Sequence, residues 1–147
     1  MPEKKRIRYS PKDKTDTRSI HQSLIFDASP TELYELLMDS RKHSHFTGSP
    51  ASISNRVSGR FTAYDGWIEG KNLELVPGKK IVQYWRGSDW PRGHYSTVQF
   101  EFFPMKNRTR LIFTQKEVPS TFHSAIAKGW TEHYWEKMKK VLAEESQ

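Results

Sequence analysis

The fold is decided by the stretch STFHSAIAKGWTEHYWEKMKKVLAEE, residues 120 to 145, because it predicts the longest helix of the chain. Its large apolar side chains recur at steps of four, four, four, four and three, as expected for a helix buried along one side. They are Phe122, Ile126, Trp130, Tyr134, Met138 and Val141. Gly129 lies in the middle of this stretch and costs about 1 kcal/mol relative to alanine. We expect either the close approach of another backbone there or a kink beside a cavity.

The N-terminal part of the chain predicts a strand and two short helices. Residues 20 to 26, IHQSLIF, alternate imperfectly between apolar and polar side chains, which indicates a strand with one buried face. Ser29 and Glu32 then form a capping-box pattern, with Pro30 at the first helical position. A second short helix, SRKHSHFTG, is expected to end near Gly48.

Residues 51 to 118 predict an antiparallel meander of about six strands. Asp65-Gly66 between aromatic-rich segments is a signal for a two-residue hairpin turn, and Pro77-Gly78 suits a type II turn. In STVQFEFF, Val98, Phe100 and Phe102 share one face of a strand. The order is therefore strand, two helices, strands and long helix. We predict an α+β helix-grip fold, in which a curved antiparallel sheet wraps around the C-terminal helix.

Composition bounds the possible functions. The 147 residues fit one domain, and a chain without cysteine has no disulfide, thiolate nucleophile or sulfur-ligated zinc. No apolar segment approaches the length of a membrane span or a secretory signal, so we expect a soluble, cytoplasmic protein without a membrane span. Of the net charge of +7, residues 1 to 18 contribute +4. We predict a basic, flexible N-terminal tail over residues 1–18, with nucleic-acid binding disfavoured, and a folded domain over 19–146.

Side chains able to perform catalysis occur, but each has a structural interpretation. His94 and Tyr95 near Asp89 resemble a proton-transfer group, yet Pro91 and Gly93 mark this segment as a turn.

Two further sets of polar residues resemble sites only in part. His43 and His45 would share a face only in an extended segment, and in a helix they would diverge. Asp65 beside Glu69 or Glu74 is explained by turn formation. Phosphate loops, dinucleotide fingerprints and hydrolase elbows are missing from the sequence. We predict no catalytic residue, no cofactor and no metal.

The most specific motifs lie in three stretches: GRFTAYDGWIEGKNLELVPGKKIVQYWR (59–86), WPRGHYSTVQFEF (90–102) and EVPSTFHSAIAKGWTEHYW (117–135). They resemble the activator of heat-shock protein 90 ATPase family, in its C-terminal START-like domain, and the similarity runs over about residues 19 to 142. The resemblance implies a helix-grip fold, related to START and birch-pollen-allergen proteins, with a groove or cavity between sheet and helix. Two departures stand out. The sequence contains nothing similar to the N-terminal domain that supplies much of the stimulation in eukaryotic activators. Arg108-Thr109 also stands where the family often has Gly-Thr.

Three functional hypotheses remain open at this point. The first is a non-enzymatic, cochaperone-like module that binds a heat-shock protein 90-type chaperone. The second is a carrier of a small apolar ligand under the long helix, and the third is a cyclase- or hydrolase-type enzyme. The predicted cavity lining is Trp85, Phe100, Phe113, Phe122, Trp130 and Tyr134, with Trp90, His94 and Tyr95 at the groove rim. The rim residues belong to WRGSDWPRGHYS (85–96), expected to form a strand-to-strand corner, in which Trp90 anchors the loop and His94 braces it. The oligomeric state is left open.

Overall fold

The computed structural model describes residues 16 to 145. The elements follow in the order β1 (Thr17–Phe26), α1 (Pro30–Met38), α2 (Ser40–Thr47), β2 (Ser52–Ile53), β3 (Arg60–Ala63), β4 (Ile68–Val76), β5 (Lys80–Gly87), β6 (Ser96–Met105), β7 (Arg108–Pro119), η2 (Ser120–Phe122), α3 (His123–Trp130), η3 (Thr131–Trp135) and α4 (Glu136–Glu145). β1 begins two residues before the predicted domain boundary at residue 19. The rest of the predicted basic tail, residues 1 to 15, lies outside the described residues.

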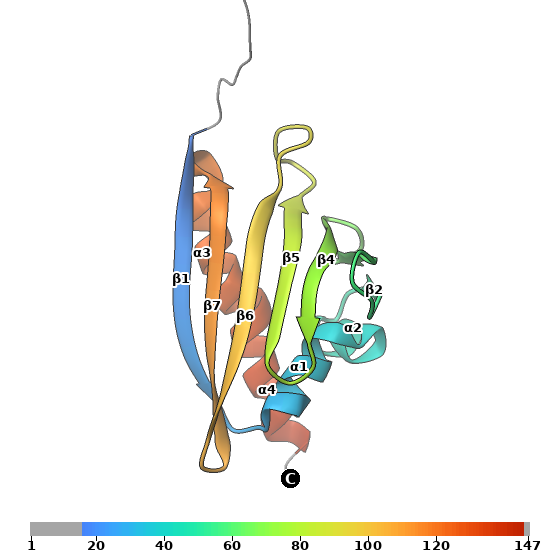
Figure 1. Ribbon diagram of the computed structural model, residues 1–147, viewed down its shortest axis with the longest axis vertical. Helices are drawn as coiled ribbons and strands as arrows, with labels where there is room; N and C mark the ends of the chain where they lie inside the picture. Colours follow the sequence, from blue (N-terminus) through green and yellow to red (C-terminus); the bar gives the residue numbers. More distant parts are fainter. Residues whose placement is uncertain (1–15, 146–147) are drawn as a thin grey trace, which may run out of the picture.

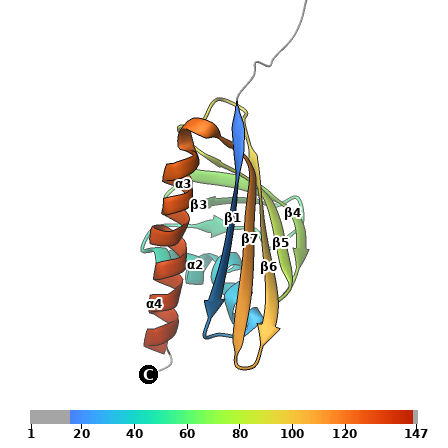
Figure 2. The same ribbon diagram turned by 90° about the vertical axis from the view of Figure 1, so that its left-hand side faces the viewer.

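The strands form one antiparallel sheet of seven strands in the order β1-β7-β6-β5-β4-β3-β2. Figure 1 shows the sheet in front of the C-terminal helix, and Figure 2 shows that helix running along the concave side of the curved sheet. This confirms the predicted α+β helix-grip fold. Within the described residues, no helix has the length and apolar character that crossing a membrane requires.

The two short helices begin and end where the sequence predicts. The Ser29 hydroxyl accepts from the Glu32 amide at 3.1 Å, and the Glu32 carboxylate accepts from the Ser29 amide at 2.9 Å. Gly48 ends α2 with a φ of 75°, a left-handed conformation that glycine adopts without a steric cost. These caps set the limits of the two helices that connect β1 to β2 along the chain.

The turn between β3 and β4 is longer than predicted. The expected two-residue Asp65-Gly66 hairpin is wrong in length, because Tyr64 also leaves the ladder and the loop spans residues 64 to 67. Tyr64, Asp65 and Gly66 have consecutive positive φ angles of 49°, 55° and 89°. The wider loop turns Tyr64 toward the C-terminal helix, where it contributes to the site described below.

Large aromatic side chains fill the space between sheet and helix. The rings of Phe113 on β7 and Trp130 on α3 have centres 4.4 Å apart, and Trp135 stacks on Trp130 at 5.5 Å. The Trp130 indole within this layer is satisfied, since it donates to the buried Gln115 amide oxygen at 2.7 Å. Trp135, absent from the predicted stripe, is 2% exposed. The helix therefore buries a wider face than its sequence pattern predicts.

The C-terminal helix contains one wide π-helical turn, η3, between α3 and α4. In a regular α-helix each step of four residues turns by about 400°, so a stripe repeating every four residues drifts around the axis. A π-turn has more residues per turn and corrects part of that drift, which keeps Trp130, Tyr134 and Met138 buried together. A Cβ at Gly129 would meet only His133 Cδ2, at 3.8 Å, so the expected close backbone approach is wrong. The other expectation, a kink beside a cavity, holds in part, because Gly129 lies beside a cavity.

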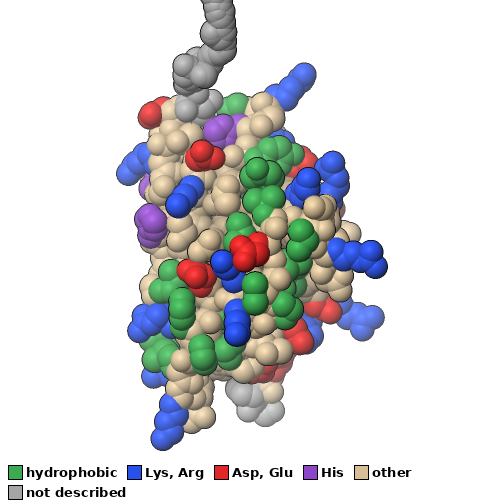
Figure 3. Space-filling model, in the orientation of Figure 1, with side chains coloured by type: hydrophobic (Ala, Val, Ile, Leu, Met, Phe, Trp, Pro, Cys, Tyr) green, Lys and Arg blue, Asp and Glu red, His purple; other side chains and the backbone are tan. Residues whose placement is uncertain are grey.

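Within residues 16 to 145, no helix covers the outer face of the sheet. In Figure 3, which views the molecule from this side, hydrophobic side chains and charged side chains of both signs are interspersed across the strands. Tyr84 on β5 and Phe103 on β6 are 44% and 46% exposed on this face. The sheet is thus buried on its concave side and open on its convex side.

Candidate functional site

A cavity of about 630 Å³ lies between the C-terminal helix and strands β3 to β5, and it opens to solvent. This volume is within the range of small-molecule sites. The helix supplies one wall from α3 and η3, and the β3–β4 loop and β5 supply the other. The lining residues are Tyr64, Trp67, Ile68, Trp85, Asp89, Phe122, Ala125, Ile126, Lys128, Gly129, Trp130, Glu132, His133 and Tyr134.

Six of the fourteen residues that line the cavity are phenylalanine, tyrosine or tryptophan. Trp85 points to the concave side of β5, and its ring centre lies 5.6 Å from that of Trp130 and 6.2 Å from that of Trp67. Tyr64 and Tyr134 meet edge to face at 5.9 Å. Such contacts hold the rings in fixed orientations and leave a wall that is apolar and rigid.

Four of the six predicted lining residues border the cavity: Trp85, Phe122, Trp130 and Tyr134. Phe100 and Phe113 do not, because they lie behind Trp130, with ring centres 5.9 Å and 4.4 Å from it. The alternation of apolar and polar side chains predicted correctly which face of β6 and β7 is buried. It could not show that the helix covers this part of the sheet and separates Phe100 and Phe113 from the cavity.

Sequence reasoning missed Tyr64 and Trp67. Gly87 gives a signal for Trp67, because a Cβ on Gly87 would lie 2.8 Å from Cη2 of the Trp67 ring. The glycine on β5 therefore leaves room for the indole. Tyr64 had no comparable signal, since its position depends on the length of the Asp65-Gly66 loop.

Tyr134, which borders the cavity, is hydrogen-bonded to a buried histidine that does not border it. His43 Nε2 lies 2.8 Å from the hydroxyl of Tyr134, and His43 Nδ1 lies 3.0 Å from the carbonyl oxygen of Leu37. Because a carbonyl only accepts, Nδ1 carries the proton, and Nε2 accepts from the Tyr134 hydroxyl. Burial lowers the pKa of His43 to about 4, although the hydrogen bond to Leu37 opposes this, and burial raises the pKa of Tyr134 well above its ordinary value. Both groups are neutral at pH 7.

His43 is therefore a structural group rather than half of a metal pair. In α2 the side chain of His43 is 5% exposed, whereas His45 points to solvent, so the two diverge as a helix requires. Residues 16 to 145 contain no cluster of three His, Asp or Glu side chains that would hold a metal. The helical spacing of His43 and Phe46, both buried, is the signal that would have placed His43 in the core.

Tyr64 fastens the β3–β4 loop to the π-turn. Its hydroxyl donates to the carbonyl oxygen of His133 at 2.6 Å, and its ring contacts the His133 ring at 5.6 Å. Partial burial raises the pKa of Tyr64 to about 12. The bond connects the two walls of the cavity across 69 residues of sequence.

Charged side chains lie at the mouth of the cavity. Asp89 and Glu132 are acidic, and Lys128 is basic; all three are exposed. Lys128 Nζ lies 3.7 Å from Glu132 one helical turn away. The mouth therefore has a formal charge of −1 with His133 neutral.

The three predicted rim residues do not border the cavity. Trp90 is 4% exposed and packs between Trp85 and Phe122, with ring centres 5.4 Å and 6.3 Å away. His94 Nε2 meets the carbonyl oxygen of Glu117 at 2.8 Å, which ties the loop to β7. Tyr95 packs beside Tyr84 on the outer face of the sheet.

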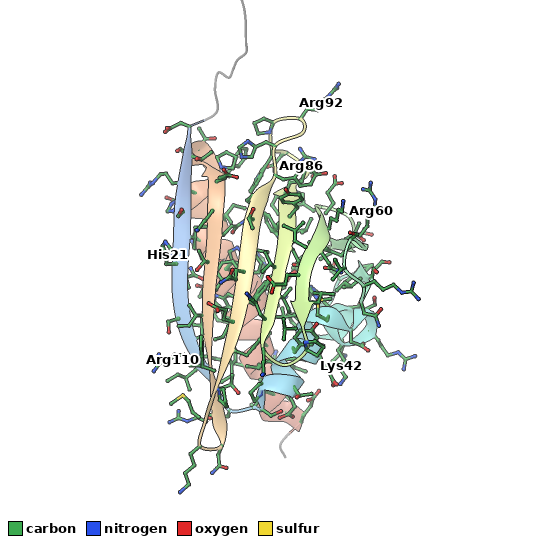
Figure 4. All side chains as sticks on the ribbon, viewed as in Figure 1. His21, Lys42, Arg60, Arg86, Arg92 and Arg110 are labelled. Carbon is green, nitrogen blue, oxygen red and sulfur yellow. The ribbon has the colours of Figure 1, made fainter. Side chains whose placement is uncertain are left out.

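Arg86 holds the corner formed by residues 87 to 95. Its guanidinium donates to the carbonyl oxygens of Trp90 at 2.8 Å, Pro91 at 3.3 Å and His94 at 3.3 Å. It also pairs with Glu69 on the neighbouring strand at 3.3 Å. Figure 4 shows Arg86 at the base of the loop, while Arg92 extends into solvent from its tip. The corner thus positions Asp89 at the cavity mouth and performs no chemistry that its geometry reveals.

Comparisons with known proteins agree with this architecture. Residues 27–143 match the family model described as activator of Hsp90 ATPase homolog 1-like protein. The chain is 32% identical over 129 residues to human activator of 90 kDa heat shock protein ATPase homolog 1, and 32% identical over 126 residues to the mouse homolog 2. These alignments cover 88% and 86% of this chain but only 38% of each relative.

Solved structures of similar extent share the fold. The structure of an HSP90 activator from Plasmodium falciparum matches with a TM-score of 0.81 and 27% identity, covering 85% of this chain and 96% of that one. The solution structure of an Aha1 dimer from Colwellia psychrerythraea matches with a TM-score of 0.73 and 19% identity, covering 85% and 96%. Since the family model spans most of the described residues, the chain belongs to the activator of Hsp90 ATPase homolog 1-like family.

Proposed function

We propose that this chain is a non-enzymatic, cochaperone-like module that binds an Hsp90-type chaperone in the cytoplasm and shifts its conformational population. The observation that carries the proposal is the match with the Plasmodium falciparum HSP90 activator, which extends over 96% of that chain at 27% identity. A docking protein changes a chaperone's ATPase rate only by binding one of its conformations more tightly than another. No bond has to be made or broken by the module itself.

The chain spans about 38% of the length of the curated relatives that it matches. Binding of the chaperone and stimulation of its ATPase are therefore proposed for this chain and need their own test.

The outer face of the sheet is the surface that we assign to chaperone docking. Register places Lys71, Tyr84, Thr97 and Lys116 opposite one another on four neighbouring strands, so their side chains form one row across this face. Tyr84 also contacts Tyr95 at 6.1 Å, and the Arg86 guanidinium carbon lies 5.8 Å above the Tyr95 ring. Tyrosine and arginine are enriched where interfaces have their largest energies, and the flanking lysines favour an acidic partner surface.

A binding measurement with matched variants tests this surface. We expect the chain to bind a purified Hsp90-type chaperone with a Kd on the order of tens of micromolar or tighter, as for transient partners. Tyr84→Ser with Lys71→Glu should weaken binding at least about tenfold. Val57→Ser is the control, since Val57 is 58% exposed but lies outside the sheet. An equal loss of affinity in the double variant and in Val57→Ser would refute the assignment of the outer face. If the unchanged protein does not bind, the chaperone proposal itself is refuted.

A second function, the binding of a small apolar ligand, is favoured by the cavity of about 630 Å³ with its aromatic walls. Native mass spectrometry and NMR with a library of lipids and aromatic compounds would test it. The proposal expects shift changes around Trp130 and Tyr134, and unchanged spectra across the library would contradict it. Turnover of any such compound that is lost in a Tyr134→Phe variant, but not in a His94→Gln variant, would favour an enzyme instead.

A further inference from the structure

We infer that the cavity selects an amphipathic ligand whose apolar, ring-containing body ends in a protonated amine. This inference rests on the second proposed function, ligand binding, and names the class of ligand. It follows from the hydrogen-bonding state of the two cavity tyrosines, from the aromatic walls, and from the charges at the mouth.

Both cavity tyrosines have already used their only proton. The Tyr134 hydroxyl donates to His43 Nε2, because Nδ1 of that ring is committed to the Leu37 carbonyl. The Tyr64 hydroxyl donates to the His133 carbonyl at 2.6 Å. A phenol has one donor proton, and its remaining capacity is to accept. A polar group that a ligand brings to either oxygen must therefore be a donor, which excludes a carboxylate.

The aromatic walls also favour a positively charged ligand. Trp67, Trp85 and Trp130 border the cavity, and an aromatic ring attracts a cation that lies over its face and repels an anion there. The same rings provide apolar area for the ligand's body.

The mouth completes the selection. Lys128 lies 3.7 Å from Glu132, so the one lysine of the lining already faces a carboxylate. Across residues 16 to 145, no lysine, arginine or histidine lies within ion-pairing distance of Asp89. Asp89 is therefore available to a ligand's ammonium group, on a loop that Arg86 holds in place.

Three ligands of one shape and different charge test the inference: tryptamine, neutral 3-ethylindole and anionic indole-3-propionate. Titrations of the full chain at pH 7, followed by ¹H–¹⁵N NMR of the tryptophan indoles, give the three affinities. The affinity for tryptamine should be at least about tenfold higher than that for 3-ethylindole, and indole-3-propionate should bind most weakly.

A variant at the cavity mouth and a control elsewhere distinguish the effect of charge on ligand binding from the effect of ligand shape. Asp89→Asn should reduce the preference for tryptamine over 3-ethylindole at least about threefold and leave the affinity for 3-ethylindole unchanged. Asp27→Asn, an exposed carboxylate outside the cavity lining, is the control and should change neither affinity. Both are surface positions, so the fold should tolerate them.

The possible failures are distinguishable. Equal binding of the three ligands, or tighter binding of indole-3-propionate, would overturn charge selection while leaving ligand binding in place. If none of the three binds and a broad library also gives no shifts, ligand binding itself is refuted together with this inference. Chaperone binding is measured separately and is unaffected by either result.

Discussion

The hydroxyl of Tyr134 and Nε2 of His43 lie 2.8 Å apart, and this bond joins the π-turn of the C-terminal helix to the short helix α2. Phe46 packs against both rings, at 5.0 Å and 5.7 Å. Lys137 adds a second link by donating to the Thr47 carbonyl at 3.2 Å. This hydrogen bond therefore joins two residues that lie 91 positions apart in the sequence.

Removing the hydroxyl should destabilise the fold. Tyr134→Phe leaves the buried His43 Nε2 without its donor, and we expect the free energy of unfolding to fall by about 1–3 kcal/mol in urea denaturation. Tyr84→Phe, at a position that is 44% exposed, should change it by less than about 0.5 kcal/mol. Equal effects of the two substitutions would show that the buried hydrogen bond contributes no more than an exposed hydroxyl.

The buried histidine should make stability depend on pH. His43 has a pKa of about 4 in the folded protein and about 6.5 when unfolded, so the unfolded chain binds the extra proton first as the pH falls. This contribution to stability is complete above pH 6.5 and is lost progressively toward pH 4. We expect a loss of about 2 kcal/mol between pH 7 and pH 5 from this residue, measured by urea denaturation at each pH.

A variant isolates that contribution from other titrating groups. His43→Gln does not titrate, so its free energy of unfolding should change by about 2 kcal/mol less than that of the unchanged protein over the same pH interval. Parallel pH profiles for the two proteins would mean that His43 is not desolvated in solution.

Arg86 should control the order of the corner over residues 87 to 95. Within it, the Trp90 amide donates to Gly87 at 3.1 Å and the His94 amide to Pro91 at 3.0 Å. Lysine has the charge but not the planar fork that reaches several carbonyls. Arg86→Lys should speed hydrogen exchange at both amides about tenfold or more, whereas Arg92→Lys, at the exposed loop tip, should not. Unchanged exchange in the first variant would contradict this role.

The local features of the fold were predictable from the sequence, because each depends on a few neighbouring residues. The Ser29–Glu32 capping box, the left-handed Gly48 and the turn at Gly78 all occur where their residue types indicate. The helix-grip arrangement followed from element order together with the family resemblance. Trp85, Trp130 and Tyr134 were identified by periodicity together with the cavity that the family resemblance implied.

The rest of the site depends on contacts between distant elements. The partnership of His43 with Tyr134 spans 91 residues, and that of Tyr64 with His133 spans 69. The burial of Trp135 depends on the π-turn, for which the repeated four-residue step was a signal that a regular helix could not satisfy. Trp90 was placed at a rim because it lies in the corner between two strands, yet its indole lies in the core.

Two glycines should respond in opposite directions to alanine. Gly129 is helical, and an added Cβ would meet only His133 Cδ2 at 3.8 Å, so Gly129→Ala should stabilise by roughly 0.5–1 kcal/mol. At Gly70 a Cβ would overlap the Tyr84 carbonyl oxygen and clash with the Phe61 ring. Gly70→Ala should cost about 2 kcal/mol or more. Thermal unfolding of both variants checks this, and a destabilising Gly129→Ala would show that the helix requires glycine there for another reason.

The chaperone's ATPase rate is the decisive measurement of whether this chain acts on an Hsp90-type chaperone through its outer sheet face. The rate should rise with the concentration of the chain and saturate. The Tyr84→Ser and Lys71→Glu double variant should lose the effect, while Val57→Ser should retain it. An unchanged ATPase rate at saturating concentrations of the folded protein would refute this role.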